Sequence, residues 1–543
     1  MVSMFNHLIE ELTMNTIKIK LADLIRKSSL VIMLLISACD SGFEEMNKNP
    51  NAFTDPVIGS LFSYNLVRTA GASDDNTLYP NDKLAGAMMQ IFASLNPYQW
   101  TGDKYLKKAG YTDGLFNAVY NVELKENIQI LTLTKDDPDM VNQYNIARIW
   151  HVYIMHRATD MYGDVPYFDA GKGYTEGLYK PKFDKQEDIY ADMLKELDEA
   201  ARSLDASKSS FGSADYIYSG DVGKWKTFAY SMMLRLGLRL TKVDENLAET
   251  WVKKALVGGV MQSNDDIARL NHSAGGELNY YWDGRELQGG EGVPPSEEGK
   301  GYGKMAQTFV SHLKDTKDPR LPFYITLWPG NADASKLPTS TNPADQKGLP
   351  SGYDANSIKS IIPDWTDESY AQFSEINLHT VAHDATPSIF LSYNEVKLYL
   401  AEVALRGWDN GDPKTYYEEA VNASMTMGSL YPGSFSISQA DIDQYLVDNP
   451  YVAGTFDQQM EQIHTQFWVS QFMNNMEIYA NWRRTGYPKL TPTNYPGNET
   501  GGTIPRRIPY PQSEAAINID NYRAAIDSQG PDLWTTRIWW DKE

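Results

Sequence analysis

The stretch "YNIARIWHVYIMHRATDMYGDVPYF", from Tyr144 to Phe168, decides the fold class of this chain. Its apolar residues recur at the i, i+3, i+4 and i+7 spacing that places them on one face of an α-helix. Gly163 and then Pro166 follow the last apolar pair and supply a helix stop. The stretch therefore predicts one long buried helix that ends near Gly163.

Four further stretches carry the same helical spacing. They are "GDVGKWKTFAYSMMLRLGLRL" (220–240), "YNEVKLYLAEVALRG" (393–407), "KTYYEEAVNASMTMG" (414–428) and "QQMEQIHTQFWVSQFMNNMEIYANWRRTG" (458–486). We expect the middle two to pair and to end at Gly407 and Gly428, and the last to form one long helix that ends near Gly486. We assign Trp150, Trp225 and Trp468 to the core, because helical periodicity already places them on packed faces.

Helix pairs in series are typical of helical repeat scaffolds. No fixed sequence period is visible, so any repeats are degenerate. Residues 272–303 and 328–365 are rich in Gly, Pro, Ser and Asn with interspersed aromatic residues, and loops of this length usually bind a ligand or lack order. The tail "IPRRIPYPQSEAAINIDNY" (504–522) is interrupted by proline, which predicts an extended segment. We expect one mainly α-helical domain.

The only cysteine of the 543 residues, Cys39, follows a short apolar run. Lys18, Lys20, Arg26 and Lys27 precede the run 30–36, which is far shorter than the roughly 20 residues that cross a bilayer. This pattern predicts a signal peptide at residues 1–38, with Met14 as an alternative start, since Glu10 and Glu11 are unusual in a signal. A buried core cysteine is the alternative for Cys39.

Charge excludes one class of partner. The chain has 71 Asp and Glu against 49 Lys and Arg, a formal net charge of −22, which repels phosphate backbones. We therefore expect no nucleic-acid partner. Aromatic residues make up 12% of the chain, and their flat apolar faces serve either a core or a sugar-binding surface.

Several of these stretches together carry a family resemblance. "ATDMYGDVPYFDA", the stretch at 220–240, "FLSYNEVKLYLAEVALRGW", "NWRRTGYPKL" and the 504–522 tail stand in that order behind "ISAC", which is similar to a bacterial lipobox. The chain thus resembles the SusD/RagB family of outer-membrane lipoproteins from about Cys39 to Tyr522.

The resemblance implies a scaffold of tetratricopeptide-like helix pairs with long ligand-binding loops, in a single domain at residues 39–543 with a short N-terminal tether. It implies a lipid on Cys39, an export signal in Asp40, Glu44 and Glu45, and a location on the outside of the outer membrane. The implied partner is a SusC-like TonB-dependent transporter, to which the protein delivers glycans or, in some members, peptides.

Catalytic and metal-binding motifs are weak throughout. Glu395 and Glu402 lie on one face of a predicted helix, where a structural role is favoured over the acid and base of a glycosidase. His379 and His383 lack the glutamate of a zinc HExxH motif, and Pro387 argues against a helix there. The acidic runs at 74–76, 137–140 and 264–266 lack the pattern of a calcium loop. We expect no enzyme and no cofactor, with structural calcium left open.

A glycan site needs aromatic faces surrounded by hydrogen-bonding side chains. Three loop stretches offer both, although their aromatic residues would serve equally to fasten the loops to the scaffold. The candidate ligand-binding residues are Tyr98, Trp100 and Asp103 in the first stretch, Asn279, Tyr280, Tyr281, Trp282, Asp283 and Arg285 in the second, and Trp328 and Asn331 in the third.

Two paired arginines remain, Arg483 and Arg484, and Arg506 and Arg507. We favour a structural role for them, as clamps on internal carboxylates. For the whole chain, the alternatives to a glycan-binding protein are a peptide-binding member of the same family, a cell-surface hydrolase and an adhesion protein.

Overall fold

The computed structural model describes Met14 and residues 57–71, 78–98, 100–273, 303–327, 340–377, 379–383 and 385–543. The chain divides into two units, Met1–Val57 and Ile58–Glu543. Nearly all described residues belong to the second unit, which starts within the predicted domain. Cys39 and the predicted signal cleavage point lie outside the described residues, so lipidation stays a prediction.

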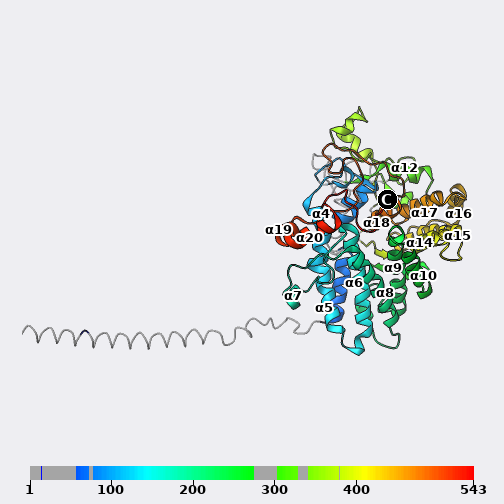
Figure 1. Ribbon diagram of the computed structural model, residues 1–543. Helices are drawn as coiled ribbons and strands as arrows, with labels where there is room; N and C mark the ends of the chain where they lie inside the picture. Colours follow the sequence, from blue (N-terminus) through cyan, green and yellow to red (C-terminus); the bar gives the residue numbers. More distant parts are fainter. Residues whose placement is uncertain are drawn as a thin grey trace, which may run out of the picture. The chain divides into compact units, whose positions relative to one another are not determined.

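Helices dominate the unit Ile58–Glu543, as the fold-class prediction requires (Figure 1). The α-helices are α3 Ile58–Thr69, α4 Ala109–Ala118, α5 Leu124–Thr134, α6 Val141–Tyr162, α7 Gly173–Glu176, α8 Gln186–Ser203, α9 Val222–Arg239, α10 Glu245–Gly258, α12 Gln307–Asp315, α13 Leu321–Tyr324, α14 Tyr393–Leu405, α15 Pro413–Thr426, α16 Gln439–Asp448, α17 Phe456–Ser470, α18 Asn475–Thr485, α19 Gln512–Ile517 and α20 Ile519–Gln529. Leu78–Gly86 and Val119–Glu123 are π-helical.

The strongest periodic stretches form the predicted helices. Helix α6 ends at Tyr162, and Gly163 takes a φ of 88°, a left-handed region that glycine enters without steric cost. Helix α14 is followed by Gly407 with a φ of 73°, and α14 packs on α15 as expected. The other predicted glycine stop is displaced, because α15 ends at Thr426 and Gly428 lies inside a 3₁₀ turn, Met427–Leu430.

Two predictions about helix continuity were wrong. The stretch 458–486 forms two helices, α17 and α18, because the chain turns between them at Met473, whose φ is 74°. The second helix does end where expected, since Gly486 follows it with a φ of 82°. The 504–522 tail is extended only as far as Pro511, after which α19 and α20 begin. Proline can precede the first turn of a helix, because N–H groups at the start of a helix have no acceptor within the helix and its missing N–H costs no hydrogen bond.

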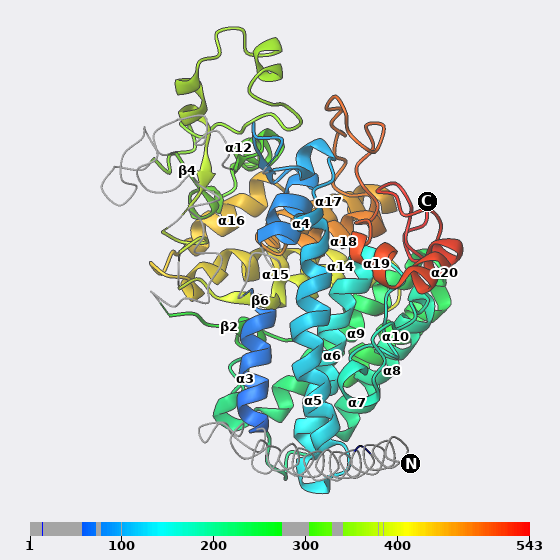
Figure 2. The ribbon, with the colours of Figure 1, turned by 90° about the vertical axis from the view of Figure 1, so that its left-hand side faces the viewer.

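The helices pack in two connected sets. Helices α5, α6, α8, α9 and α10 lie side by side (Figures 1 and 2), and each packs on its neighbour in the chain order. The second set pairs α14 with α15 and α17, and α17 with α18. Helix α9 also contacts α14, so the two sets share one core.

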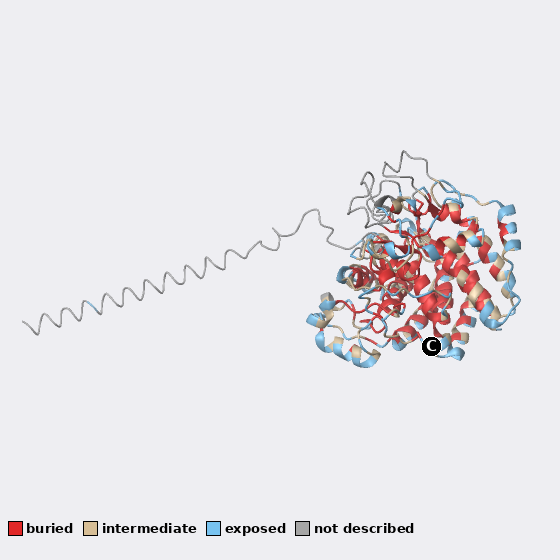
Figure 3. Ribbon diagram, turned by 90° about the horizontal axis from the view of Figure 1, so that it is seen from above, coloured by how far each residue is buried: buried red, intermediate tan, exposed pale blue. Residues whose placement is uncertain are grey.

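Aromatic side chains fill that core, which Figure 3 shows as the buried inner faces of the helices. Trp150 of α6 and Trp225 of α9 meet edge to face, with ring centroids 6.1 Å apart and planes at 89°. Trp468 of α17 is also buried, and its Nε1 donates to the carbonyl of Met89 at 2.9 Å. The assignment of these three tryptophans to the core is confirmed.

The four arginines bind partners inside the protein. Arg484 of α18 donates two hydrogen bonds to Glu402 of α14, Arg506 pairs with Asp541, and Arg507 pairs with Asp532. Arg483 instead donates to backbone carbonyls, including that of Asp160 at 2.6 Å. Three of the four thus bind carboxylates, and the fourth holds backbone, which supports the structural role favoured from the sequence.

Strands are short and form three antiparallel pairs within the described residues. β1 Phe92–Ala93 pairs with β3 Lys304–Met305, β2 Ala268–Leu270 with β6 Ser388–Leu391, and β4 Ile325–Thr326 with β5 Glu375–Ile376.

Candidate ligand-binding face

Three of the short strands lie next to the three candidate stretches in the sequence. The first stretch follows β1, the second lies in the segment that ends just before β3, and the third follows β4. Strand β5 lies between β3 and β4: it pairs with β4, and the amide of Met305 in β3 donates to the carbonyl of Ser374 at 2.9 Å. We call the strands β1, β3, β5 and β4 the platform. Segments more than 200 residues apart in the sequence therefore start or end on one small scaffold.

The platform has a small hydrophobic cluster of its own. Its buried members include Ala93, Ala306, Leu349, Trp365 and Phe373, and they form a cluster separate from the main core. The rings of Trp365 and Phe373 stack with centroids 5.8 Å apart. Burial of these side chains stabilises strands that are too short to be stable alone.

A buried ion pair joins two of the platform strands. Lys304 of β3 binds the carboxylate of Glu375 of β5, and its ammonium group also lies 4.8 Å from the ring centroid of Tyr370. Burial raises the pKa of Glu375, and the positive charge of Lys304 partly offsets that shift. A buried charge without its partner is costly, so this pair fixes the spacing of β3 and β5.

The first candidate stretch divides into an anchor and an exposed tip. The side chain of Trp100 is fully buried and meets Phe92 of β1 edge to face, with centroids 5.9 Å apart. Asp103 is also buried: one carboxylate oxygen lies 2.8 Å from Lys104 Nζ and the other accepts from the amide of Gly352. Tyr98 is 81% exposed. Trp100 and Asp103 therefore fasten the loop, and Tyr98 alone of the three is open to a ligand.

The side chains of the other two stretches lie outside the described residues. These are Asn279, Tyr280, Tyr281, Trp282, Asp283 and Arg285 in the second stretch, and Trp328 and Asn331 in the third. Their anchor points are described. A Cβ atom on Gly303 would lie 2.5 Å from the ring of Trp100, so the end of the second segment packs against the first. Leu327 and Ser340, which flank the segment of the third stretch, are joined by two backbone hydrogen bonds.

A second junction ties two more loop ends together. The hydroxyl of Ser388 in β6 donates to the carbonyl of Ala70 at 2.9 Å, so Nε2 of His272, also 2.9 Å away, must donate to Ser388. Burial lowers the pKa of His272 to about 4, which keeps the imidazole neutral at pH 7. The described residues Ala70 and His272, just before Gly71 and Ser273, are thus joined through Ser388.

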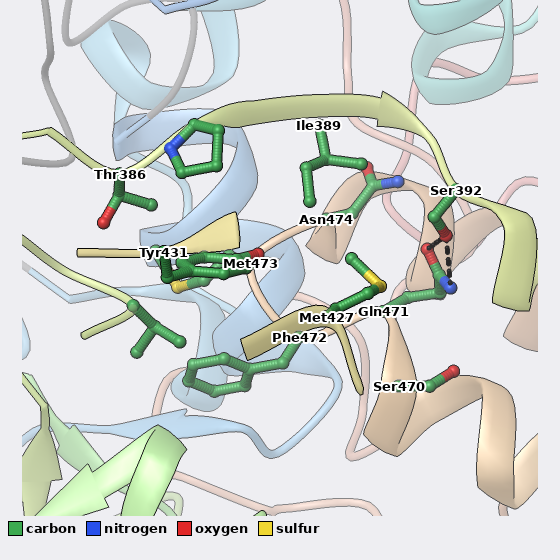
Figure 4. Close-up of a pocket in the computed structure, with 12 residues that line it drawn as sticks. Thr386, Ile389, Ser392, Met427, Tyr431, Ser470, Gln471, Phe472, Met473 and Asn474 are labelled. Atoms are coloured by element: carbon green, nitrogen blue, oxygen red, sulfur yellow. Dashed lines mark hydrogen bonds between the residues drawn. The ribbon is translucent and has the colours of Figure 1, made fainter. Parts of the chain in front are cut away.

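A small cavity lies beside this junction, between β6 and the turn that joins α17 to α18 (Figure 4). Ile389, Met427, Tyr431 and Met473 supply apolar walls, and a hydrogen bond joins Ser392 to Gln471 at its edge. Its volume is about 40 Å³. Since one water occupies about 30 Å³ of liquid, the cavity has room for a water or a methyl group and not for a sugar ring.

The paired glutamates of α14 have structural partners. Glu395 accepts two hydrogen bonds from Arg235, and Glu402 accepts two from Arg484, with all four side chains at most 1% exposed. Burial opposes ionisation of Glu402, but the charges of Arg484 and Arg406 hold its pKa well below the usual range. No substrate can reach either carboxylate in this arrangement, so the structural role favoured from the sequence is supported.

Metal-binding geometry is absent from the part of the chain that the structure describes, where no three His, Cys, Asp or Glu side chains converge. His379 and His383 lie in a turn, and Nδ1 of His383 accepts from the amide of Ala385. Two of the acidic runs cap turns instead: Asp137 accepts from the amide of Asp139, and Asp266 from that of Gln262. The third, at 74–76, lies outside the described residues.

Comparison with known proteins identifies the family. The profile of the SusD-like family, described as "Starch-binding associating with outer membrane", matches residues 50–511. A solved chitin-binding protein is 32% identical over 90% of this chain and all of its own, with a TM-score of 0.76. A Bacteroidetes SusD-like protein is 26% identical with the same coverage and a TM-score of 0.77. This chain belongs to the SusD-like family.

A more distant likeness concerns the fold alone. A chitin-binding SusD homologue from Flavobacterium johnsoniae is 23% identical, over 89% of this chain and 98% of its own, with a TM-score of 0.73. No curated protein matches the chain. The SusD-like structures have a tetratricopeptide-like helical fold, so the predicted family and fold class are confirmed. Among the described helices, none is long and apolar enough to cross a membrane.

Proposed function

We propose that this protein is a lipid-anchored lipoprotein on the outside of the outer membrane, which captures oligosaccharides and delivers them to a SusC-like TonB-dependent transporter. The observation that supports the proposal is the platform, whose strands β1, β3 and β4 flank the three candidate segments in the sequence. The family description, of starch-binding proteins that associate with the outer membrane, supports a glycan as ligand. So does the 32% identical chitin-binding protein.

The candidate residues have the chemistry that sugars need. Pyranose rings have apolar faces that pack on aromatic rings, and hydroxyl groups that bind amides, carboxylates and guanidinium groups. Trp282 stands in the sequence beside Asn279, Asp283 and Arg285, which supply all three polar types. Tyr98 adds an exposed ring at the first stretch. These residues therefore support binding of a sugar as the proposed role.

The anchor follows from the N-terminal sequence. We propose that residues 1–38 are removed and that Cys39 carries the acyl chains, with residues 39–57 as the tether to the compact unit. Each buried methylene contributes about 0.8 kcal/mol, and two or more chains give stable attachment. Asp40, Glu44 and Glu45 would direct export to the outer leaflet.

The test is calorimetric titration of the full chain in mild detergent with plant, host and microbial oligosaccharides and with mixed oligopeptides. Trp282→Ala is the test variant. Tyr216→Ala is the matched control, since Tyr216 is a half-exposed aromatic residue in another part of the scaffold. We expect one glycan class to bind, Trp282→Ala to abolish that binding without lowering the unfolding temperature, and Tyr216→Ala to leave it unchanged.

Other outcomes decide against the proposal in different ways. Binding of peptides alone would place the protein among peptide-importing members of the family. Release of shortened sugars from a bound glycan would identify a hydrolase. No binding of any glycan, with a folded chain, would contradict the proposed capture of sugars.

A further inference from the structure

A groove on the surface is lined by residues outside the three candidate stretches. It lies between the end of α12, the start of α13 and the segment 435–441 that leads into α16, and its volume is about 430 Å³. Ligand pockets in proteins usually measure about 300–1,000 Å³, so the groove has the size of a binding site, unlike the cavity of about 40 Å³ beside β6.

Two tight turns shape the groove. Helix α12 stops because Lys317 takes a left-handed conformation, with a φ of 50°, and the amide of Asp318 returns to the carbonyl of Leu313 at 2.8 Å. On the other side, Gly433 and Ser434 both have positive φ and turn the chain into an extended segment. Phe435, Ser436 and Ile437 of this segment all line the groove.

The floor of the groove is apolar and rigid. Leu313, Leu321, Phe435 and Ile437 line it, together with prolines 319, 322 and 343, which have no backbone N–H to offer. The ring of Phe435 is held by Phe323, on which it stacks at 5.1 Å. Asp318 also lines the groove, but Arg320 donates to both of its carboxylate oxygens. The floor therefore presents little that binds a hydroxyl group.

The rim supplies one donor and one acceptor. The side chain of Lys317 is 79% exposed, and its ammonium group forms a surface pair with Asp448 at 3.3 Å. Exposed pairs of this kind are worth at most about 1 kcal/mol, so Lys317 can turn to a ligand. Asp441 is an exposed carboxylate on the first turn of α16, where its Oδ2 accepts from the hydroxyl of Ser438 at 2.6 Å, and Ser436 also lines the groove.

We infer that this groove binds the acetamido group of an N-acetylated sugar. The methyl of that group fits the apolar floor. Its carbonyl oxygen can accept from the Lys317 ammonium, and its N–H can donate to the Asp441 carboxylate. A sugar with only hydroxyl groups has no apolar group to pack on the floor. Its hydroxyl groups would give up hydrogen bonds to water there and gain none in return. The inference rests on the proposed function, since it names the class of glycan that the protein captures.

Hydrogen bonds connect the groove with the platform. Nζ of Lys314, which lines the groove, donates to the carbonyl of Gln346 at 2.7 Å. The side chain of Gln346 accepts from Ser374, next to β5, and donates to the carbonyl of Ser340, where the third loop returns. The groove is therefore a subsite fixed to the scaffold that carries the candidate loops.

The experiment compares two hexasaccharides with the same β-1,4 linkage, one of N-acetylglucosamine and one of glucose, which differ only at carbon 2. Ser436→Trp fills the groove from its exposed rim without touching the core. Ala440→Trp is the matched control, because Ala440 is exposed nearby and does not line the groove. Affinity is measured by calorimetry on the full chain in detergent, and saturation transfer from protein to ligand protons by NMR.

We expect the wild-type chain to prefer the N-acetylglucosamine hexamer, with the strongest saturation on its acetamido methyl protons. Ser436→Trp should lower that affinity by about tenfold and remove the methyl preference, and Asp441→Asn should weaken binding in the same direction. Ala440→Trp should behave as wild type. Equal affinity of Ser436→Trp and Ala440→Trp, or equal affinity of the wild type for both hexamers, would overturn the inference while the proposed function stands. Failure of the wild type to bind any glycan of the wider panel would remove both.

Discussion

The guanidinium of Arg484 donates to both carboxylate oxygens of Glu402, at 2.7 and 2.6 Å, in the interior between α18 and α14. Arg406 donates to the same carboxylate, and Nε2 of His464 lies 3.1 Å from it. Glu402 thus compensates two arginines, one of them fully buried. Removing one member of such a group leaves the others charged in a medium that solvates them poorly.

Glu402→Gln should therefore lower the free energy of unfolding by about 3–5 kcal/mol, although its shape is almost unchanged. Urea unfolding of the full chain measures this loss. The control is Lys414→Met, which breaks an exposed pair with Glu418 at 3.7 Å and should cost at most about 1 kcal/mol. Equal midpoints for Glu402→Gln and wild type would show that the buried group contributes no net stability.

The first candidate stretch gives a second prediction, because its two aromatic residues have opposite environments. Trp100→Ala empties a fully buried site and should cost about 3–5 kcal/mol of stability, seen as a lower unfolding temperature. Tyr98→Ala removes a ring that is 81% exposed, so stability should change by less than about 0.5 kcal/mol. On the proposed function, Tyr98→Ala should instead lower glycan affinity by about tenfold. Loss of stability without loss of affinity in Tyr98→Ala would contradict this division of roles.

The sequence predicts long helices well and short elements poorly, for physical reasons. Helices α6, α9 and α14 each bury a repeating face, and α6 and α14 end next to Gly163 and Gly407, so periodicity and stop signals agree there. The break before α18 lies at Met473, a residue with no preference for a positive φ; the Asn474–Asn475 pair that follows was the only local signal for a new helix start. Likewise, Ser513 and Glu514 after Pro511 marked the start of α19, and the run of prolines concealed it.

The candidate site was predictable in composition and not in geometry. The platform strands β1, β3, β4 and β5 have two residues each, too few for any periodicity to appear. Trp100 and Tyr98 are two residues apart in one loop, and nothing in the sequence separates the buried ring from the exposed one. The groove residues Lys317, Phe435 and Asp441 come from segments that the helical pattern leaves unmarked, so they were not among the candidates.

Gly303 links the second candidate segment to the first, which gives a third prediction. A Cβ atom there would approach Cζ2 of Trp100 to 2.5 Å, and the rigid indole ring is fully buried. Gly303→Ala should therefore displace the ring or the strand β3 and cost about 1–3 kcal/mol, measured as a fall in unfolding temperature. Gly407→Ala is a control of another kind, since its Cβ would meet no atom and only its φ of 73° opposes the change. If both variants lose the same stability, close packing on Trp100 is not the cause.

The last prediction concerns Asp82, which the π-helical segment Leu78–Gly86 buries against the start of α18. Its Oδ1 accepts hydrogen bonds from the side-chain amides of Asn81 and Asn475, both at 2.8 Å. Burial raises the pKa of Asp82 from 3.8 to about 8, against the effect of these hydrogen bonds and of the Lys83 charge. Well below the ordinary pKa of 3.8, the carboxyl group is neutral in both the folded and the unfolded chain, so its contribution to stability is then complete. As the pH rises toward 8, the unfolded chain releases the proton and the folded chain keeps it, so this contribution is lost.

Asp82→Asn has no proton to release at this position. The free energy of unfolding of Asp82→Asn, minus that of wild type, should therefore increase between pH 5 and pH 8, by at most about 1.4 kcal/mol per pH unit. Urea unfolding at each pH measures the difference. Asp412→Asn serves as the control, since Asp412 is an exposed cap of α15 whose pKa lies below 3.8, and its difference should stay flat over this range. Parallel curves for Asp82→Asn and wild type would mean that Asp82 is ionised in the folded protein at neutral pH. Its negative charge would then be stabilised by Asn81, Asn475 and Lys83.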